Sequence, residues 1–169
     1  MTTIDRARFT LVSCRLRSSS TDETRALAAA LAPVAEAGDR LALVGPLGAG
    51  KTQFAKGFAV GLGIDEVVNS PSFTLMAEYE GRLTLFHQDL YRLHDAGEVF
   101  AGGLLDERQD EGVTLSEWAD RLDEDLDPGR VTVLIEPTGP ERREIEIRGR
   151  GLAAERYAAV ARRWQEGHA

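Results

Sequence analysis

Hydrophobic and polar residues follow two kinds of spacing along this chain. Apolar residues that recur every three or four positions predict a helix, whereas alternating or short aliphatic runs predict a strand. The segments with helical spacing are 21–37, 51–62 and 152–164. The segments with strand-like spacing are 9–13, 40–45, 73–80, 83–87, 113–117, 131–136 and 143–148. We therefore predict an α/β fold, a mixed and partly antiparallel sheet flanked by helices, as a single domain over residues 1–169.

Local signals predict how some of these elements begin and end. Either Thr21 or Asp22 has a side chain suited to cap the first helix, and Gly63 is placed to close the second. Gly81 and Arg82 lie between two strand-like segments and predict a hairpin with a two-residue connection.

Composition limits the classes of protein that the chain can represent. It has 169 residues, of which 43% are hydrophobic, enough for the core of one domain. Its 28 acidic residues outnumber its 20 basic residues and give a net charge of -8, which disfavours binding of nucleic acid by bulk electrostatics. The acidity is concentrated in 95–127, with twelve acidic residues and two arginines, which predicts a solvated face or a surface for a basic partner.

The cysteine content and the first residues bear on the cellular compartment. Cys14 is the single cysteine, which excludes a disulfide framework and a multi-cysteine zinc site, and we expect it to be buried on a strand. The first residues are charged at Asp5, Arg6 and Arg8 and lack the apolar core of a signal peptide, and no apolar run has the length of a membrane span. These features predict a cytoplasmic protein without a membrane partner.

The strongest motif is GPLGAGKT at 45–52, which matches the phosphate-binding P-loop pattern and lies between a predicted strand and a predicted helix. It begins at Gly45, and the small residues Gly48, Ala49 and Gly50 allow consecutive backbone N–H groups to turn inward around a phosphate. The helix that follows directs the positive end of its dipole at the same place. The motif predicts a P-loop NTPase-like domain.

Lys51 and Thr52 are the side chains that a simple glycine turn at a helix start would not need. A P-loop lysine contacts the β- and γ-phosphates, and the following hydroxyl is a ligand of the Mg²⁺ that accompanies ATP. The site also needs a carboxylate near the metal, and three strand ends offer one: Asp89, Glu117 and Glu136. Judged by the hydrophobic residues that precede it, Glu136 is the first choice.

Four blocks together resemble the bacterial TsaE family, formerly called YjeE, the ATPase subunit of the machinery that makes threonylcarbamoyladenosine in tRNA. The blocks are GPLGAGKT at 45–52, NSPSFTL at 69–75, HQDLYRL at 87–93 and SEWAD at 116–120. The residues DET at 22–24 fit the amino-terminal element of that family. The P-loop block is generic, whereas the combination of the other three is specific.

This resemblance implies roles for individual residues. Glu117 of the EW pair is implied as the carboxylate on the metal side, in preference to Glu136, and Asp89 as a second functional acid that orients water or the metal shell. Ser70 and Thr74 are implied as a nucleotide-sensing switch beside the phosphates. An ordinary turn before a strand is the alternative for the segment around Ser70, and a helix cap or an ion pair is the alternative for Asp89.

Further positions have weaker implied roles. Thr24 is implied as a nucleotide contact near the adenine end. The chain departs from the family pattern at Pro46, Gln53 and Ser116. These departures bear on nucleotide affinity and on the rate of hydrolysis rather than on the class of reaction. Gln53 stays among the expected nucleotide contacts.

Several residues near the blocks allow more than one interpretation. Trp118 is suited to stack near the nucleotide, to form a partner surface or to pack in the core. Tyr91 and Arg92 are suited to serve the nucleotide site or a partner, and Arg92 or an arginine of a partner is a candidate arginine finger. We interpret His87 as a packed strand residue without a catalytic role.

The resemblance implies a Mg-ATP-dependent ATPase that is weak alone and stimulated by partners. Its implied partners are TsaD- and TsaB-type subunits of the threonylcarbamoyl transferase complex, which would make most of the contact with tRNA. Two alternatives share the P-loop: a small-molecule or nucleotide kinase, and a nucleotide-gated binding module that does not need hydrolysis.

Overall fold

Alternating strands and helices begin at Leu11 in the computed structural model, which describes residues 10–71, 75–91, 107–121 and 129–168. The strands are β1 (Leu11–Ser18), β2 (Arg40–Val44), β3 (Met76–Glu80), β4 (Thr84–Asp89), β5 (Val113–Glu117), β6 (Val131–Pro137) and β7 (Arg143–Arg150). The α-helices are α2 (Thr21–Leu31), α3 (Lys51–Gly61) and α5 (Leu152–Gly167). Short 3₁₀ turns are η1 (Ala32–Val34), η2 (Glu107–Glu111) and η3 (Ala119–Arg121).

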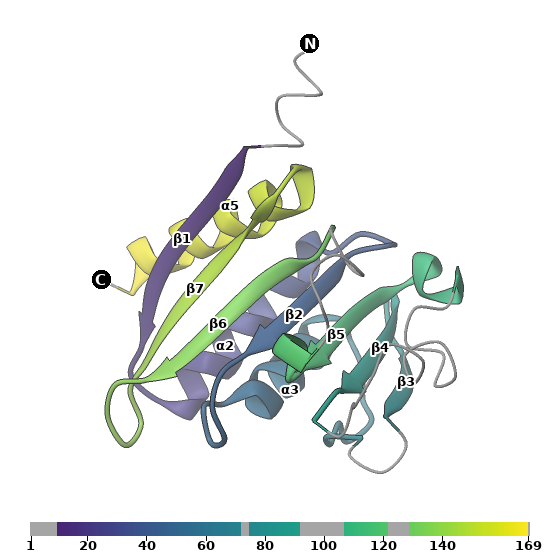
Figure 1. The fold of residues 1–169 in the computed structure, drawn as a ribbon, viewed down its shortest axis with the longest axis horizontal. Helices are drawn as coiled ribbons and strands as arrows, with labels where there is room; N and C mark the ends of the chain where they lie inside the picture. Colours follow the sequence, from purple (N-terminus) through teal and green to yellow (C-terminus); the bar gives the residue numbers. More distant parts are fainter. Residues whose placement is uncertain (1–9, 72–74, 92–106, 122–128, 169) are drawn as a thin grey trace.

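The described strands form one mixed sheet in the order β1-β7-β6-β2-β5-β4-β3 (Figure 1). The four central strands β6, β2, β5 and β4 are parallel, whereas β1, β7 and β3 pair in antiparallel fashion at the two sides. The predicted α/β class with a partly antiparallel sheet is therefore confirmed. The parallel centre places the carboxyl ends of β2, β5 and β4 at the same edge of the sheet, where ligands bind in such folds.

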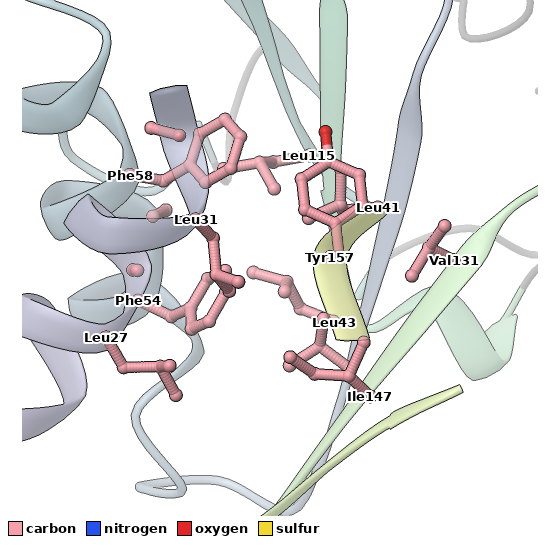
Figure 2. Packing of buried hydrophobic residues seen from close by; sticks show 14 of the residues in the cluster. Leu27, Leu31, Leu41, Leu43, Phe54, Phe58, Leu115, Val131, Ile147 and Tyr157 are labelled. Carbon is pink, nitrogen blue, oxygen red and sulfur yellow. The ribbon is translucent and has the colours of Figure 1, made fainter. Parts of the chain in front are cut away.

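The α-helices of the described residues, α2, α3 and α5, lie on the same side of the sheet (Figure 1). Apolar residues of α2 and α3 point toward apolar residues of the strands, and Tyr157 of α5 lies among them (Figure 2). The labelled members of this core are Leu27, Leu31, Leu41, Leu43, Phe54, Phe58, Leu115, Val131, Ile147 and Tyr157. Since α3 packs into this core along its length, its first turn is held rigidly at the sheet edge.

The first predicted helix differs from the observed one at both ends. Its cap is Ser20 rather than Thr21 or Asp22, because the Ser20 hydroxyl accepts a hydrogen bond from the Glu23 amide at 3.1 Å. The α-helix ends at Leu31 rather than at residue 37. Pro33 cannot donate the next backbone hydrogen bond, so the chain tightens into η1.

Strand boundaries also differ from their predictions. The first strand is predicted to end at residue 13, but β1 continues to Ser18 because all eight of its residues pair with β7. Its predicted start at residue 9 lies outside the described residues. The hairpin between β3 and β4 closes on the pair Glu80 and Thr84, so its connection has three residues rather than two. β3 begins at Met76, and the predicted start at residue 73 also lies outside the described residues. No helix among the residues described has both the length and the apolar character needed to cross a membrane.

Candidate functional site

A cavity of about 480 Å³ opens at the carboxyl edge of the parallel strands. β4 and β5 end there in register, with Asp89 beside Glu117, and Glu117 is also in register with Leu43 of β2. The volume lies in the range of small-molecule sites. The predicted site residues that line the cavity are Thr24, Gly48, Ala49, Gly50, Lys51, Thr52, Gln53, Ser70, Asp89 and Glu117.

Gly45 does not line the cavity, and Thr74 lies outside the described residues. Gly45, which directly follows β2, instead allows the chain to pass close to β6, because a Cβ atom there would lie 2.4 Å from the backbone oxygen of Ile135. The candidate arginine finger Arg92 and much of the acidic segment 95–127 are also outside the described residues.

The P-loop joins β2 to α3 and forms one wall of the cavity. Gly48 and Gly50 have φ angles of 79° and 110°, a left-handed conformation that favours glycine. α3 begins at Lys51 immediately after the loop, and the first residues of the helix line the cavity. Because the first amides of a helix have no intrahelical acceptor, this end of α3 is suited to bind an anion.

The Lys51 ammonium group is buried beside the loop, with 5% of the residue exposed. Its Nζ donates to the backbone oxygen of Gly45 at 2.5 Å and to that of Pro46 at 2.9 Å. The ring of Trp118 covers the same nitrogen at 3.8 Å from the ring centroid, which is cation–π geometry. These contacts hold the positive charge at the mouth of the phosphate loop.

Burial lowers the pKa of Lys51 below its usual value near 10.5. Nearby carboxylates oppose this effect by favouring the charged form, and they belong to Glu117, Asp120 and Asp89. An anion placed beside Nζ would also favour the charged form, so the lysine and an anionic ligand would stabilise each other.

Thr52, Glu117 and His87 form a chain of hydrogen bonds from the cavity into the core. The Thr52 hydroxyl donates to Oε1 of Glu117 at 2.7 Å, and the other carboxylate oxygen, Oε2, lies 2.6 Å from Nε2 of His87. Glu117 is 2% exposed and His87 is fully buried. Because its hydrogen is directed at Glu117, the Thr52 hydroxyl presents its lone pairs elsewhere, as a metal ligand must.

Ser70 and Asp89 form a second polar pair at the cavity. The Ser70 hydroxyl donates to Oδ2 of Asp89 at 2.5 Å, and Oδ1 of Asp89 accepts the backbone N–H of Tyr91 at 3.0 Å. Asp89 therefore fixes the turn after β4 as well as facing the cavity, which combines the predicted functional position with the cap-like alternative.

The side chains of Thr24 and Gln53 are engaged within the protein. Thr24 is 2% exposed, and its hydroxyl lies 2.8 Å from that of Ser18. The Gln53 side-chain oxygen accepts from Nε of Arg25 at 2.8 Å, which ties α3 to α2. Glu136, the first choice from the strand pattern, is exposed and does not line the cavity.

Trp118 and Tyr91 lie against each other at the cavity wall. Their ring centroids are 4.9 Å apart, and both residues line the cavity. Trp118 has a φ angle of 55°, a left-handed conformation that is rare for a bulky residue and that the packing around it must maintain. Trp118 thus lies at the cavity wall, and its stacking near a nucleotide stays a prediction.

Sequence reasoning missed Arg143 and the environment of His87. Nε of Arg143 donates to the Ala49 oxygen at 2.7 Å, and Nη2 donates to the Gly48 oxygen at 3.1 Å. Nothing in the alternating pattern of its strand singles out this arginine. For His87 a signal existed: it is two residues from Asp89 on one strand, so both side chains lie on the same face.

The oxygen donors at the cavity suit Mg²⁺ bound together with phosphates. Among the described residues there is no cluster of three or more His, Cys, Asp or Glu side chains able to hold a metal ion. A protein cage of carboxylates is therefore absent from this part of the chain. Mg²⁺ commonly takes only one or two protein ligands and completes its shell with waters and phosphate oxygens, so Thr52 and Glu117 fit the ion.

Comparison with known proteins decides the family. The sequence model of the family described as "Threonylcarbamoyl adenosine biosynthesis protein TsaE" matches residues 18–145. The chain belongs to the TsaE family. Among TsaE relatives, the protein of Bacillus subtilis (strain 168) is 46% identical over 130 residues, which are 76% of this chain and 81% of the relative. The TsaE protein of Treponema pallidum is 39% identical over 133 residues, 79% of this chain and 98% of the relative.

A solved structure has a similar fold. The crystal structure of Bacillus subtilis YdiB aligns with a TM-score of 0.71 and 37% sequence identity, and covers 95% of this chain and 99% of that chain. The chain therefore shares its overall fold with YdiB over nearly its whole length. The family match also includes every predicted site residue, because all of them lie between 18 and 145.

Proposed function

We propose that this TsaE chain is a Mg-ATP-dependent P-loop ATPase that supports the threonylcarbamoyladenosine modification of tRNA. The observation that carries the proposal is the cavity in which Lys51, Thr52 and Glu117 meet at the start of α3. The family supports the pathway, because both the family and its relatives are named for threonylcarbamoyladenosine biosynthesis.

In this proposal the P-loop and Lys51 bind the phosphates. The amides around Gly48, Ala49 and Gly50 and the N-terminus of α3 supply hydrogen bonds and positive potential in a partly enclosed site. Lys51 adds a full charge that already lies beside the loop. Electrostatic stabilisation of this kind is the largest contribution to phosphoryl transfer, which needs little covalent chemistry from the protein.

Thr52 and Glu117 bind Mg²⁺ in this proposal, and Ser70 and Asp89 belong to the part of the site that senses the nucleotide. When bound, Mg²⁺ neutralises phosphate charge as a Lewis acid. Glu117 orients the Thr52 hydroxyl by accepting its hydrogen, which leaves the lone pairs of that oxygen free to bind a cation. Asp89 keeps the Ser70 hydroxyl at the cavity and is placed to orient water, while Thr74, Thr24 and Gln53 complete the proposed nucleotide contacts.

The partners in this proposal are the TsaD- and TsaB-type subunits of a cytoplasmic threonylcarbamoyl transferase complex. The net charge of -8 argues against a direct grip on tRNA, so these subunits would make most of the contact with the nucleic acid. Hydrolysis by the chain alone is expected to be slow, with Arg92 or an arginine of a partner completing the stabilisation of charge.

A set of three variants tests this assignment. Lys51→Ala is expected to weaken binding of ATP, because it removes the charge beside the loop. Glu117→Ala is expected to lower ATP hydrolysis by about a hundredfold while binding is retained, and Glu136→Ala serves as the matched control. If Glu136→Ala abolishes hydrolysis and Glu117→Ala does not, the carboxylate assignment is wrong.

Two further measurements separate the proposal from its alternatives. ADP release that needs an added small-molecule acceptor, but no partner protein, would indicate a kinase. Modification of tRNA that continues for many rounds with a non-hydrolysable ATP analogue would indicate a binding module that needs no hydrolysis.

A further inference from the structure

His87 lies directly behind the carboxylate proposed for the metal side. It sits on β4 at 0% exposure, and its Nε2 is 2.6 Å from Oε2 of Glu117. Its other ring nitrogen, Nδ1, is buried and has no hydrogen-bond partner within the described residues. In this part of the chain, Glu117 is therefore the residue to which the imidazole is hydrogen-bonded.

The surroundings favour one position for the imidazole hydrogen. A nitrogen lone pair facing a carboxylate oxygen at this distance would be repelled, so we assign a hydrogen to Nε2, where it is donated to Glu117. The opposite neutral tautomer would also leave an N–H group at Nδ1 buried without an acceptor among the described residues, which adds a further cost.

This hydrogen bond fixes the second oxygen of Glu117. Oε1 is occupied by the Thr52 hydroxyl, and Oε2 is occupied by His87. A carboxylate held at both oxygens cannot rotate about its terminal bond without breaking one of the two bonds. The orientation of the Thr52 hydroxyl thus depends on a residue that does not line the cavity.

We propose that His87 is a positioning residue that acts through Glu117 to orient the Thr52 hydroxyl toward Mg²⁺, an inference that rests on the proposed function. The strand neighbours on the same face, Leu85 and Leu115, are fully buried and apolar. A leucine at 87 would suit that environment without an unpaired nitrogen, so packing alone does not account for an imidazole at this place. The pairing with Glu117 does account for it.

Two polar substitutions distinguish positioning from packing. In His87→Gln the side-chain nitrogen reaches about as far along the side chain as Nε2 of histidine, so it can donate to Glu117. In His87→Asn the amide nitrogen reaches only the level of Nδ1 and cannot. His87→Leu is the apolar control, because it fills the space without any donor.

The measurement is the concentration of Mg²⁺ that gives half-maximal ATP hydrolysis, together with nucleotide binding in EDTA. Residues that orient metal ligands typically change metal affinity or activity by about tenfold to a hundredfold. We expect His87→Asn and His87→Leu to raise the half-maximal Mg²⁺ concentration about tenfold or more, and His87→Gln to stay within about threefold of wild type. Binding in EDTA should be unchanged in all three.

A wild-type Mg²⁺ dependence in a folded His87→Leu or His87→Asn protein overturns the inference while leaving the proposed function intact. The inference is also overturned if all three variants raise the half-maximal Mg²⁺ concentration in proportion to their loss of thermal stability. That result would indicate that His87 contributes packing alone. If wild type itself shows no Mg²⁺-dependent binding of ATP, the proposed function fails and the inference fails with it.

A second readout uses the wild-type chain without nucleotide or metal. Nitrogen-15 NMR of the imidazole rings reports which nitrogen carries the hydrogen, and the chain has three histidines to assign. We expect hydrogen on Nε2 of His87, with a changed Nε2 signal in Glu117→Gln. A signal from hydrogen on Nδ1 alone would contradict the proposed bond, whether or not any variant folds.

Discussion

Arg143 links the start of β7 to the P-loop, and its removal should weaken nucleotide binding more than it weakens the fold. The guanidinium donates to the backbone oxygens of Ala49 and Gly48, and it also bonds carbonyls of its own turn, including that of Gly139 at 3.1 Å. In Arg143→Ala the two bonds to the loop are lost. The loop then samples conformations in which its amides no longer converge on a phosphate.

The size of the effect follows from the two bonds. A hydrogen bond to a charged group contributes about 1.5–3 kcal/mol, and the lower end or less applies here because Gly48 is exposed and water replaces the arginine. We take about 1 kcal/mol for each bond, or about 2 kcal/mol for ordering the loop. Since about 1.4 kcal/mol corresponds to a factor of ten, affinity for ATP should fall by about tenfold to thirtyfold.

Isothermal titration calorimetry with ATP and Mg²⁺ measures this change. Arg142→Ala is the matched control. It removes the same charge at the neighbouring residue, and the Arg142 side chain is exposed and does not line the cavity. Arg143→Lys should recover part of the affinity, since an ammonium group supplies charge without the planar fork. Equal weakening in Arg142→Ala and Arg143→Ala would refute the reasoning, because bulk charge would then be the cause.

Two predictions concern the fold that supports the site. Gly57→Ala should lower the free energy of unfolding in urea by about 2 kcal/mol, because the added Cβ would lie 2.2 Å from the Arg25 backbone oxygen of α2. The cost of this clash outweighs the gain in helix propensity. Val60→Ala, at an exposed position of the same helix, is the control and should change little. Burial, together with a 2.6 Å hydrogen bond to Asp39, raises the pKa of Tyr157 above its usual value near 10. The free energy of unfolding that this raised pKa contributes is present below about pH 10 and is lost as the pH rises further. Tyr157→Phe should lack that loss. Equal slopes of unfolding free energy against pH above about pH 10 in both proteins would contradict this prediction.

Much of the fold follows from local pattern, because strands and helices in this chain bury one consistent face. The parallel centre and the P-loop helix agree with the hydrophobic runs and with the glycine loop at 45–52. The errors lie at boundaries. Pro33 ends α2 early, and pairing with β7 extends β1 to Ser18, a long-range contact that no local window contains.

The candidate site was less evenly predictable. Sequence spacing identified the loop residues, but strand pattern alone favoured Glu136, because hydrophobicity before a carboxylate does not say whether its side chain faces the cavity. β6, which carries Glu136, also pairs with β2, but Glu136 is exposed and does not line the cavity. Glu117, which the family resemblance implied, is buried and accepts a hydrogen bond from Thr52. Arg143 reaches the loop through a contact 94 residues apart in sequence, and it lies in none of the four blocks. His87 does lie in the block HQDLYRL, but its contact with Glu117, 30 residues away, depends on the pairing of β4 with β5.

The most direct test of the proposed function is a reconstituted tRNA modification assay with purified TsaD- and TsaB-type partners. It counts threonylcarbamoyladenosine formed per complex, with and without this chain, under excess tRNA and Mg-ATP. We predict many rounds with the wild-type chain, and no more than about one round without it or with Glu117→Ala. Equal modification in the presence and absence of the chain would contradict the account.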